Sequence, residues 1–152
     1  MRAAAIVLCT LLVGALVSCG EAARVDSPSA ALVQVFKSPT CGCCVKWAEH
    51  LEASGFQVET TDVGDLNAVK RRHGVPPNAE ACHTALVDGY VVEGHVPASD
   101  IERLLRERPS VRGLVVPGMP HGSPGMESAT PEPYTVYAFD EAGGRSVFSR
   151  HD

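Results

Sequence analysis

The sequence predicts a mixed α/β domain in which helices cover a sheet that contains both parallel and antiparallel strands. Three observations predict it. A short apolar run at residues 31–36 is followed by a segment with helical spacing of apolar residues, and a second strand-like run comes after that segment. Asp88-Gly89 separates two further apolar runs, which is the strongest short-range signal for a β-hairpin. The 152 residues, 45% hydrophobic and 20% charged, suit one globular domain.

The predicted elements follow one another as strand, helix, strand, helix, strand, strand and helix. Two strands joined through a helix should be parallel with a right-handed crossover, whereas a hairpin adds an antiparallel pair. This order is that of the thioredoxin-like fold, in which a pair of thiols follows the first strand at the start of the first helix. The expected ranges are 31–36, 42–54, 56–63, 65–73, 84–87, 90–93 and 99–108.

Charged and polar residues at the helix ends agree with these boundaries. Lys70-Arg71-Arg72 ends the second helix with positive charge, as the helix dipole favours. Ser99 and Glu102 stand at capping-box spacing at the start of the third helix, and Pro109 lies beyond its end.

Residues 110–133 break the regularity, because Gly and Pro recur so often that we expect neither a helix nor a central strand there. Strand character returns at residues 134–139 and 145–149, around Gly143-Gly144. We therefore expect residues 31–109 to form the thioredoxin-like domain. Residues 110–152 should add a Gly/Pro/Met loop and a C-terminal β-hairpin extension that packs on the same domain.

The N-terminus has the pattern of a bacterial lipoprotein signal. Arg2 precedes a mostly apolar stretch at residues 3–17 that is too short to span a membrane comfortably. The stretch ends in Leu16-Val17-Ser18-Cys19, which resembles the lipobox, whose cysteine is acylated and becomes the mature N-terminus. Ordinary secretory cleavage near Ala23 is the alternative.

The lipobox sets the expected boundaries and location. We predict a lipoprotein signal peptide at residues 1–18, lipidation of Cys19, and a tether at residues 19–30 that joins the lipid to the domain. The protein would then lie in the periplasm. Gly20, rather than Asp, after the cysteine indicates an anchor in the outer membrane.

Three thiols are crowded into Cys41-Gly42-Cys43-Cys44, at the start of the first predicted helix. Unpaired backbone N–H groups and the helix dipole favour thiolate over thiol at such a position. Cys41 and Cys44 stand three residues apart, a geometry shared by redox dithiols and metal sites. Cys43 lies about 100° from Cys44 around a regular helix and reaches the same pocket only if the first turn is irregular. One disulfide beside an inert, buried cysteine remains an alternative.

Cys82-His83 directly precedes the third predicted strand. Thioredoxin-like folds commonly place a cis-proline there, facing the dithiol, and a peptide groove is built around it. Its replacement by Cys-His favours metal binding over thiol exchange with proteins. Adjacent residues of an extended chain point to opposite sides, so we expect Cys82 to be the ligand, with His83 as a second candidate or a packing residue.

A repeat within the Gly/Pro-rich segment adds sulfur of another kind. Pro117-Gly118-Met119 and Pro124-Gly125-Met126 are identical tripeptides, and His121 lies between them. Thioether sulfur binds Cu(I) well and Zn(II) poorly, and it needs no deprotonation. Met119, Met126 and His121 are therefore candidate copper ligands.

The remaining histidines are expected to have other roles. We interpret His95 as a hydrogen-bonded structural residue, although it stands near a helix start. His50 and His73 should lie on the surface, and His151 should be a mobile terminal residue.

Four motifs together resemble the CopG-type periplasmic copper-resistance proteins, over about residues 31–150. They are Ser38-Pro-Thr-Cys-Gly-Cys-Cys44, Cys82-His-Thr-Ala85, Val91-Val-Glu-Gly-His-Val-Pro97, and the segment from Gly113 to Met126. The resemblance implies a thioredoxin-like domain whose C-terminal extension helps to bind copper. It implies several copper ions bridged by cysteine sulfur and interconversion of Cu(I) and Cu(II) during detoxification. Cys41, Cys43, Cys44 and the Met119–Met126 loop would be copper-site residues.

The sequence thus predicts a copper-binding envelope protein of copper resistance that interconverts Cu(I) and Cu(II) at a cysteine-rich site. The alternatives are a copper carrier or buffer without catalysis, a thiol–disulfide oxidoreductase, and a zinc site made of Cys41, Cys44, Cys82 and one histidine. Copper ions, and periplasmic copper carriers or efflux systems, are the expected partners of a monomeric protein. A net charge of -5 without a basic run argues against nucleic acid.

Overall fold

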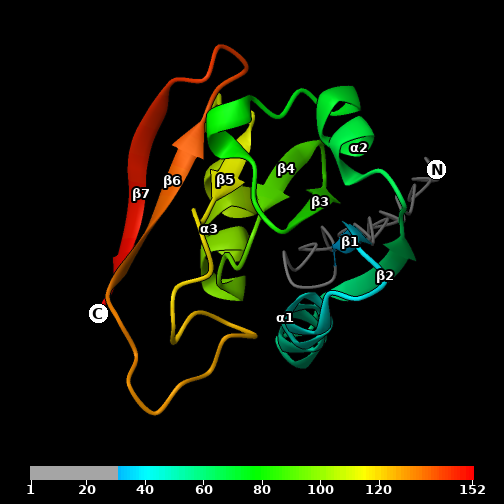
Figure 1. Ribbon diagram of the computed structural model, residues 1–152. Helices are drawn as coiled ribbons and strands as arrows, with labels where there is room; N and C mark the ends of the chain where they lie inside the picture. The colour runs from blue at the N-terminus through cyan, green and yellow to red at the C-terminus, as the bar shows by residue number, and fades with distance from the viewer. Residues whose placement is uncertain (1–30) are drawn as a thin grey trace, which may run out of the picture.

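The computed structural model describes residues 31–152, which form one mixed seven-stranded sheet and the helices that cover it (Figure 1). The predicted signal peptide, Cys19 and the tether lie outside the described residues. The strands are ordered β2-β1-β3-β4-β5-β6-β7. The elements are β1 (Leu32–Lys37), α1 (Gly42–Ala53), β2 (Gln57–Asp62), α2 (Leu66–Arg72), η2 (Pro77–Ala79), β3 (His83–Val87), β4 (Tyr90–Glu93), α3 (Ala98–Glu107), β5 (Gly113–Val115), β6 (Tyr134–Phe139) and β7 (Arg145–His151).

The first four strands confirm the predicted fold class. β1 runs parallel to β2, to which α1 connects it, and antiparallel to β3. β3 and β4 form the predicted hairpin, with Thr84 paired with Glu93. Because β1 and β3 are antiparallel, Lys37 at the end of β1 pairs with His83 at the start of β3. The chain that enters α1 and the chain that enters β3 therefore lie at the same edge of the fold.

The hydrophobic core has two parts, one on each face of the sheet. On one face, Trp47 of α1 and Ile101 of α3 pack against alternate strand residues, and the Trp47 Nε1–H donates to the Val96 carbonyl at 2.8 Å. The smaller cluster includes Val91 and Val115. Adjacent residues of a strand point to opposite faces, so these two mark the second face of the sheet. None of the described helices has the length and apolar character needed to cross a membrane.

One expectation about the segment 110–133 is wrong, because β5 lies inside it and is central in the sheet. β5 pairs in parallel with β4 and antiparallel with β6. A Cβ at Gly113 would overlap the Val91 carbonyl oxygen, so this glycine permits a close approach of two strands. Leu114 and Val115 are fully buried. The high Gly and Pro content of the segment concealed a strand of three residues.

The ends of two other elements also differ from expectation. α3 begins at Ala98 after Pro97, so Ser99 lies within the first turn and does not cap the helix. Instead His50 Nε2 accepts the Ala98 N–H at 3.2 Å. β7 continues to His151, whose ring stacks on Tyr134 and contacts Asp100 Oδ2 at 2.7 Å. His151 is therefore held against α3 rather than mobile.

Candidate metal centre

The three cysteines at the start of α1 are in two oxidation states. Cys41 and Cys44 form a disulfide, while Cys43 and Cys82 are free thiols. Cys41 stands at the N-cap position with non-helical backbone angles, and α1 begins at Gly42, so Cys43 lies within the helix and reaches the other sulfurs without an irregular first turn. Cys43 Sγ lies 3.6 Å from Cys41 Sγ and is partly exposed. Cys43 is thus an accessible thiol beside a disulfide.

Cys82 brings a fourth sulfur to the same place. The Sγ atoms of Cys41, Cys43, Cys44 and Cys82 all lie within 4.8 Å of one another. The register of β1 with β3 explains this convergence, because it places the residues before β3 beside those that follow β1. Burial and the neighbouring Cys43 raise the pKa of the Cys82 thiol to about 12. Without a bound cation this sulfur keeps its proton at neutral pH.

Cys82 also belongs to a second donor group. Its Sγ lies 3.4 Å from His83 Nδ1 and 3.2 Å from His95 Nε2, and the three donor atoms lie within 4.8 Å of one another. The expectation that Cys82 and His83 face opposite sides does not hold. Cys82 precedes β3 in a bend of the chain, so the alternation of an extended strand does not apply to this pair.

His95 is hydrogen-bonded, as the sequence predicts, and its hydrogen bonding also suits a metal ligand. Its Nδ1 lies 2.7 Å from the Pro124 carbonyl oxygen, which can only accept, so Nδ1 carries the proton. The Nε2 lone pair then faces Cys82. Metal-binding histidines commonly donate their second ring N–H to a carbonyl in this way. The hairpin register contained a signal for this position, because pairing Thr84 with Glu93 brings the residues after 93 beside those before 84.

His83 is fully buried and packs on Trp47, with ring centroids 4.3 Å apart. Its Nε2 has no hydrogen-bond partner among the described residues. Burial and the neighbouring His95 keep the pKa of His83 well below its ordinary value, and burial also lowers the pKa of His95. Both imidazoles are therefore neutral at neutral pH, which is the form that binds metals.

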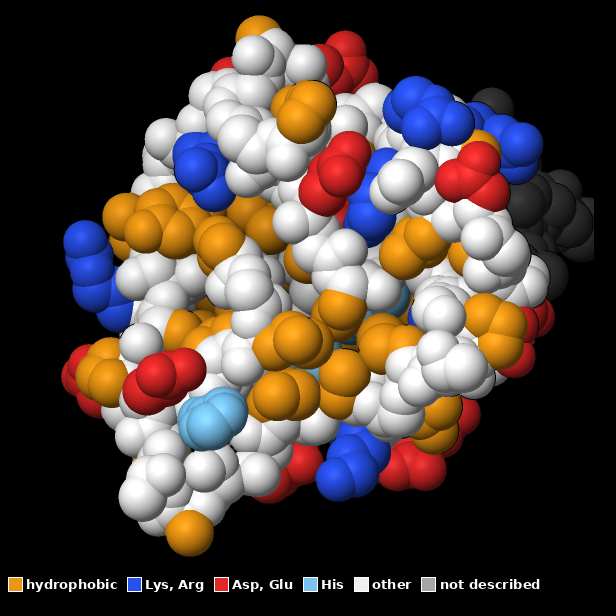
Figure 2. Space-filling model, viewed as in Figure 1, with side chains coloured by type: hydrophobic (Ala, Val, Ile, Leu, Met, Phe, Trp, Pro, Cys, Tyr) orange, Lys and Arg blue, Asp and Glu red, His pale blue; other side chains and the backbone are white. Residues whose placement is uncertain are grey.

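The second Pro-Gly-Met tripeptide docks on α1. Gly125 has a φ of +83°, and a Cβ there would lie 2.7 Å from the Cys43 carbonyl oxygen and 2.8 Å from the Trp47 nitrogen. Met126 and His121 line an open cavity of about 550 Å³ together with Cys43. Figure 1 shows the loop reaching across to α1, and Figure 2 shows hydrophobic side chains gathered there with histidine between them.

The first tripeptide lies apart from this cavity. Met119 is 52% exposed and is not among the residues that line the cavity. The structure therefore places Met126 and His121 on the cavity that the free thiol Cys43 also lines, and it leaves Met119 outside this cavity. As a ligand, Met119 stays a prediction from the sequence.

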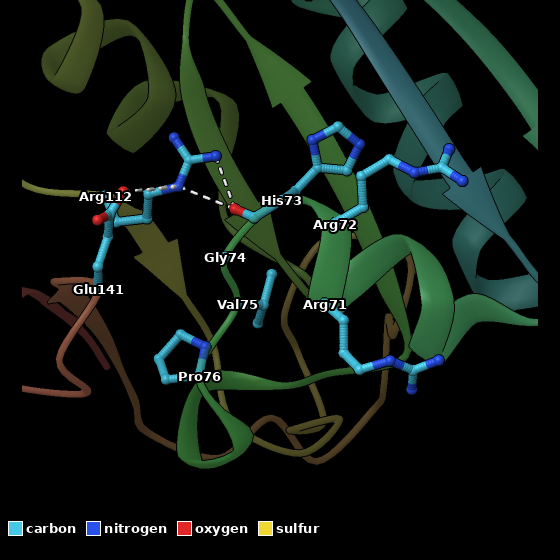
Figure 3. Close-up of a pocket in the computed structure, with 8 residues that line it drawn as sticks. All are labelled: Arg71, Arg72, His73, Gly74, Val75, Pro76, Arg112 and Glu141. Carbon is cyan, nitrogen blue, oxygen red and sulfur yellow. Dashed lines mark hydrogen bonds and ion pairs between the residues drawn. The ribbon is translucent and has the colours of Figure 1, made fainter.

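Another cavity, of about 400 Å³, lies beyond the opposite end of the β3–β4 hairpin (Figure 3). Arg112 donates from Nε and Nη2 to the His73 carbonyl oxygen and from Nη1 to the Gly89 carbonyl oxygen. The guanidinium therefore joins the end of α2 to the turn of the hairpin. The side chains of Arg71 and Arg72 extend to the side away from Arg112 and diverge from each other (Figure 3). No sulfur lines this cavity. The thiol cluster is therefore the stronger candidate for a soft metal.

Comparison with known proteins places the chain in a family. The family model "Protein of unknown function, DUF411" matches residues 79–126, from η2 through Met126. No curated protein matches the chain. Two solved structures, both of a copper resistance protein copG, in Form 2 and Form 1, are 46% identical to it. They cover 80% and 79% of this chain and 98% and 96% of their own, with TM-scores of 0.75 and 0.74. The identity, the coverage and the cysteine-rich motif together show that this chain belongs to the CopG family of copper resistance proteins.

Proposed function

We propose that this protein binds copper ions at Cys41, Cys43, Cys44 and Cys82 and interconverts Cu(I) and Cu(II) there as part of copper resistance. The observation that carries the proposal is the convergence of four sulfur atoms and two neutral imidazoles in one place. The cysteines come from two separate parts of the chain, and His95 from a third. The name of the two solved relatives supports copper as the metal.

The donor atoms suit both oxidation states of copper. Thiolate and thioether sulfur select Cu(I), whereas imidazole nitrogen suits Cu(II). The sulfur group and the Cys82, His83 and His95 group share Cys82. An ion that changes its oxidation state would thus find suitable ligands within a few ångströms, without a change of fold.

The Cys41–Cys44 pair, which forms a disulfide in this structure, can supply the electrons that reduce Cu(II). When these two residues are thiols, two Cu(II) ions can each take one electron. The products are two Cu(I) ions, one S–S bond and two released protons. Because a thiolate binds copper and a disulfide does not, Cys43 and Cys82 would be the cysteines left to hold the Cu(I) formed, and copper binding would be coupled to the oxidation state of the Cys41–Cys44 pair.

Metal analysis of anaerobically purified, reduced protein tests copper binding and separates copper from zinc. We expect copper to be retained by the wild type and lost in Cys41→Ser. Because this variant also lacks the disulfide, chemically reduced wild type is the matched control. Unchanged copper stoichiometry in Cys41→Ser contradicts the proposed site.

A redox assay separates interconversion from simple carriage. Reduced protein is mixed anaerobically with Cu(II), and the Cu(I) formed and the thiols lost are counted with a Cu(I)-specific chelator and an alkylating reagent. We expect one thiol lost for each Cu(I) formed. Binding of Cu(II) without formation of Cu(I) would indicate a carrier or buffer.

Thiol–disulfide exchange is a second candidate function, favoured by the disulfide at the start of α1. Two observations argue against this function. Cys82-His83 stands before β3 where thioredoxin-like folds commonly have a cis-proline, and residues 31–152 contain no cis peptide bond. An oxidoreductase of this kind would reduce insulin without copper and would tolerate Met126→Leu. We expect the metal-free protein to be inactive in that assay.

We also propose that the protein lies in the periplasm, anchored through lipidated Cys19, and acts as a monomer with periplasmic copper carriers or efflux systems. The lipobox at residues 16–19 supports the anchor. Cys19→Ala should release the protein from the membrane fraction of the cell and abolish labelling by a fatty acid. Membrane association that survives this substitution contradicts the anchor.

A further inference from the structure

A buried ion pair lies beside the Cys82-His83 segment, and copper binding as proposed above makes no use of it. Lys70 of α2 and Glu93 of β4 are 2% and 0% exposed, and Lys70 Nζ lies 2.6 Å from Glu93 Oε2. Taking two charges out of water is costly, and an apolar pair of similar volume is often as stable or more stable. The position of this pair therefore calls for an explanation.

The pair forms hydrogen bonds to the residues on both sides of Cys82 and His83. Glu93 Oε2 accepts the Ala81 N–H at 2.8 Å, one residue before Cys82. Glu93 Oε1 accepts the Thr84 hydroxyl at 2.6 Å, one residue after His83, and Lys70 Nζ lies 3.1 Å from the same hydroxyl oxygen. Every oxygen of the carboxylate is thus used to hold Ala81 and Thr84, and the backbone between them carries Cys82 and His83.

The charge of Lys70 also acts on both donors. Burial is the largest influence on each of them and raises the pKa of Cys82 while it lowers that of His83. The Lys70 ammonium lowers both pKa values, which favours thiolate at Cys82 and neutral imidazole at His83. Glu93 opposes Lys70 at Cys82 but is a smaller influence there. The pair as a whole is neutral, so removing one of its charges leaves the other uncompensated beside Cys82 and His83.

We propose that Lys70 and Glu93 form a positioning pair, which holds Cys82 and His83 in place for copper and keeps the charges beside them balanced. A nearby cation stabilises the oxidation state of lower charge, so Lys70 without its partner would favour Cu(I), and Glu93 without its partner would favour Cu(II). The inference rests on copper binding as proposed above and assigns Lys70 and Glu93 a role in setting the copper potential.

The test compares Lys70→Met, Glu93→Gln and the double variant with wild type, all loaded with copper. Cu(I) and Cu(II) affinities are measured by competition with chelators, and the reduction potential by redox titration. We expect Lys70→Met to lower the ratio of Cu(I) to Cu(II) affinity by about tenfold, in the range typical of residues behind metal ligands. Glu93→Gln should raise this ratio, because it leaves the positive charge uncompensated.

Opposite shifts in the two single variants cannot come from loss of stability alone. Since a buried charge without its partner can prevent folding, the double variant provides a folded comparison. It should unfold near the wild-type temperature and bind copper in both oxidation states more weakly, because Ala81 and Thr84 are held by fewer hydrogen bonds. Arg108→Asn with Asp88→Asn is the control, because it removes an exposed ion pair at the other end of the hairpin.

Three results would overturn the inference. Wild-type affinities and potential in the double variant would make the pair purely structural. In the single variants, an unchanged ratio of the two affinities would reject the effect of the charges, as would shifts of the same sign. Failure of wild type to bind copper would instead reject the proposed function itself.

Discussion

His95 Nε2 lies 3.2 Å from Cys82 Sγ, while His95 Nδ1 donates to the Pro124 carbonyl oxygen. One imidazole therefore joins the thiol cluster to the Pro-Gly-Met loop. Movement or loss of the His95 side chain should therefore disturb both the sulfur site and the loop beside it.

His95→Gln should weaken copper binding by at least about tenfold, because losses of this size follow removal even of a residue behind a metal ligand. Glutamine can keep a hydrogen bond to Pro124 but lacks the imidazole lone pair. The measurement is copper affinity by chelator competition, with His73→Gln as the control at the opposite end of the hairpin. Equal affinities in the two variants would show that His95 is structural.

Gly125→Ala should destabilise the protein by about 2–4 kcal/mol, from a left-handed backbone plus overlap with α1. Gly118→Ala is the matched control, because its φ is +74° and a Cβ there meets nothing within 4 Å. The control should lose about 1–2 kcal/mol, from the backbone term alone. Urea unfolding measures both. Copper affinity should fall only in Gly125→Ala, and equal losses of stability would argue against docking of the loop.

Met126→Leu should lower Cu(I) affinity, because Met126 lines the cavity that opens at Cys43. Leucine keeps the volume and removes the sulfur, so we expect a stability change below about 1.5 kcal/mol. Met119→Leu should leave Cu(I) affinity unchanged, since Met119 is exposed and apart from this cavity. Competition with a Cu(I) chelator measures both variants. A larger loss in Met119→Leu would reverse the assignment.

Copper affinity should rise with pH. Burial and Cys43 raise the pKa of Cys82 to about 12, so at neutral pH the thiol is protonated and copper must displace that proton. Each displaced proton adds about a tenfold gain in affinity per pH unit below the pKa. His83 and His95 have lowered pKa values, so they are already neutral above about pH 6.5 and add no such term.

Comparison of wild type with Cys82→Ser isolates this proton. The slope of the logarithm of Cu(I) affinity against pH, between about pH 6.5 and 8, should be smaller by about one in the variant. Equal slopes would mean that Cys82 either binds no copper or is already a thiolate in the free protein.

Signals within a few residues of one another were sufficient for much of the fold. Asp88-Gly89 predicted the hairpin, and the apolar spacing after Cys41 predicted a helix that begins with thiols. Both were confirmed. Dihedral preferences and periodicity act over one or two turns, so the residues themselves carry them. The strand β5 was not predicted, because a short strand that needs Gly113 for close packing resembles a loop in sequence.

The sequence by itself determined which donor atoms the protein has and that three thiols stand at a helix start. Only the tertiary structure decided which of them meet. In the sequence, Lys70 is one of three cations at a helix end, but the packing of α2 buries its side chain against Glu93. His95 reaches Cys82 through the pairing of β3 with β4, and Met126 lines the cavity at Cys43 because Gly125 lets the loop touch α1. Such contacts depend on strand register and on the packing of distant segments, which no local pattern encodes.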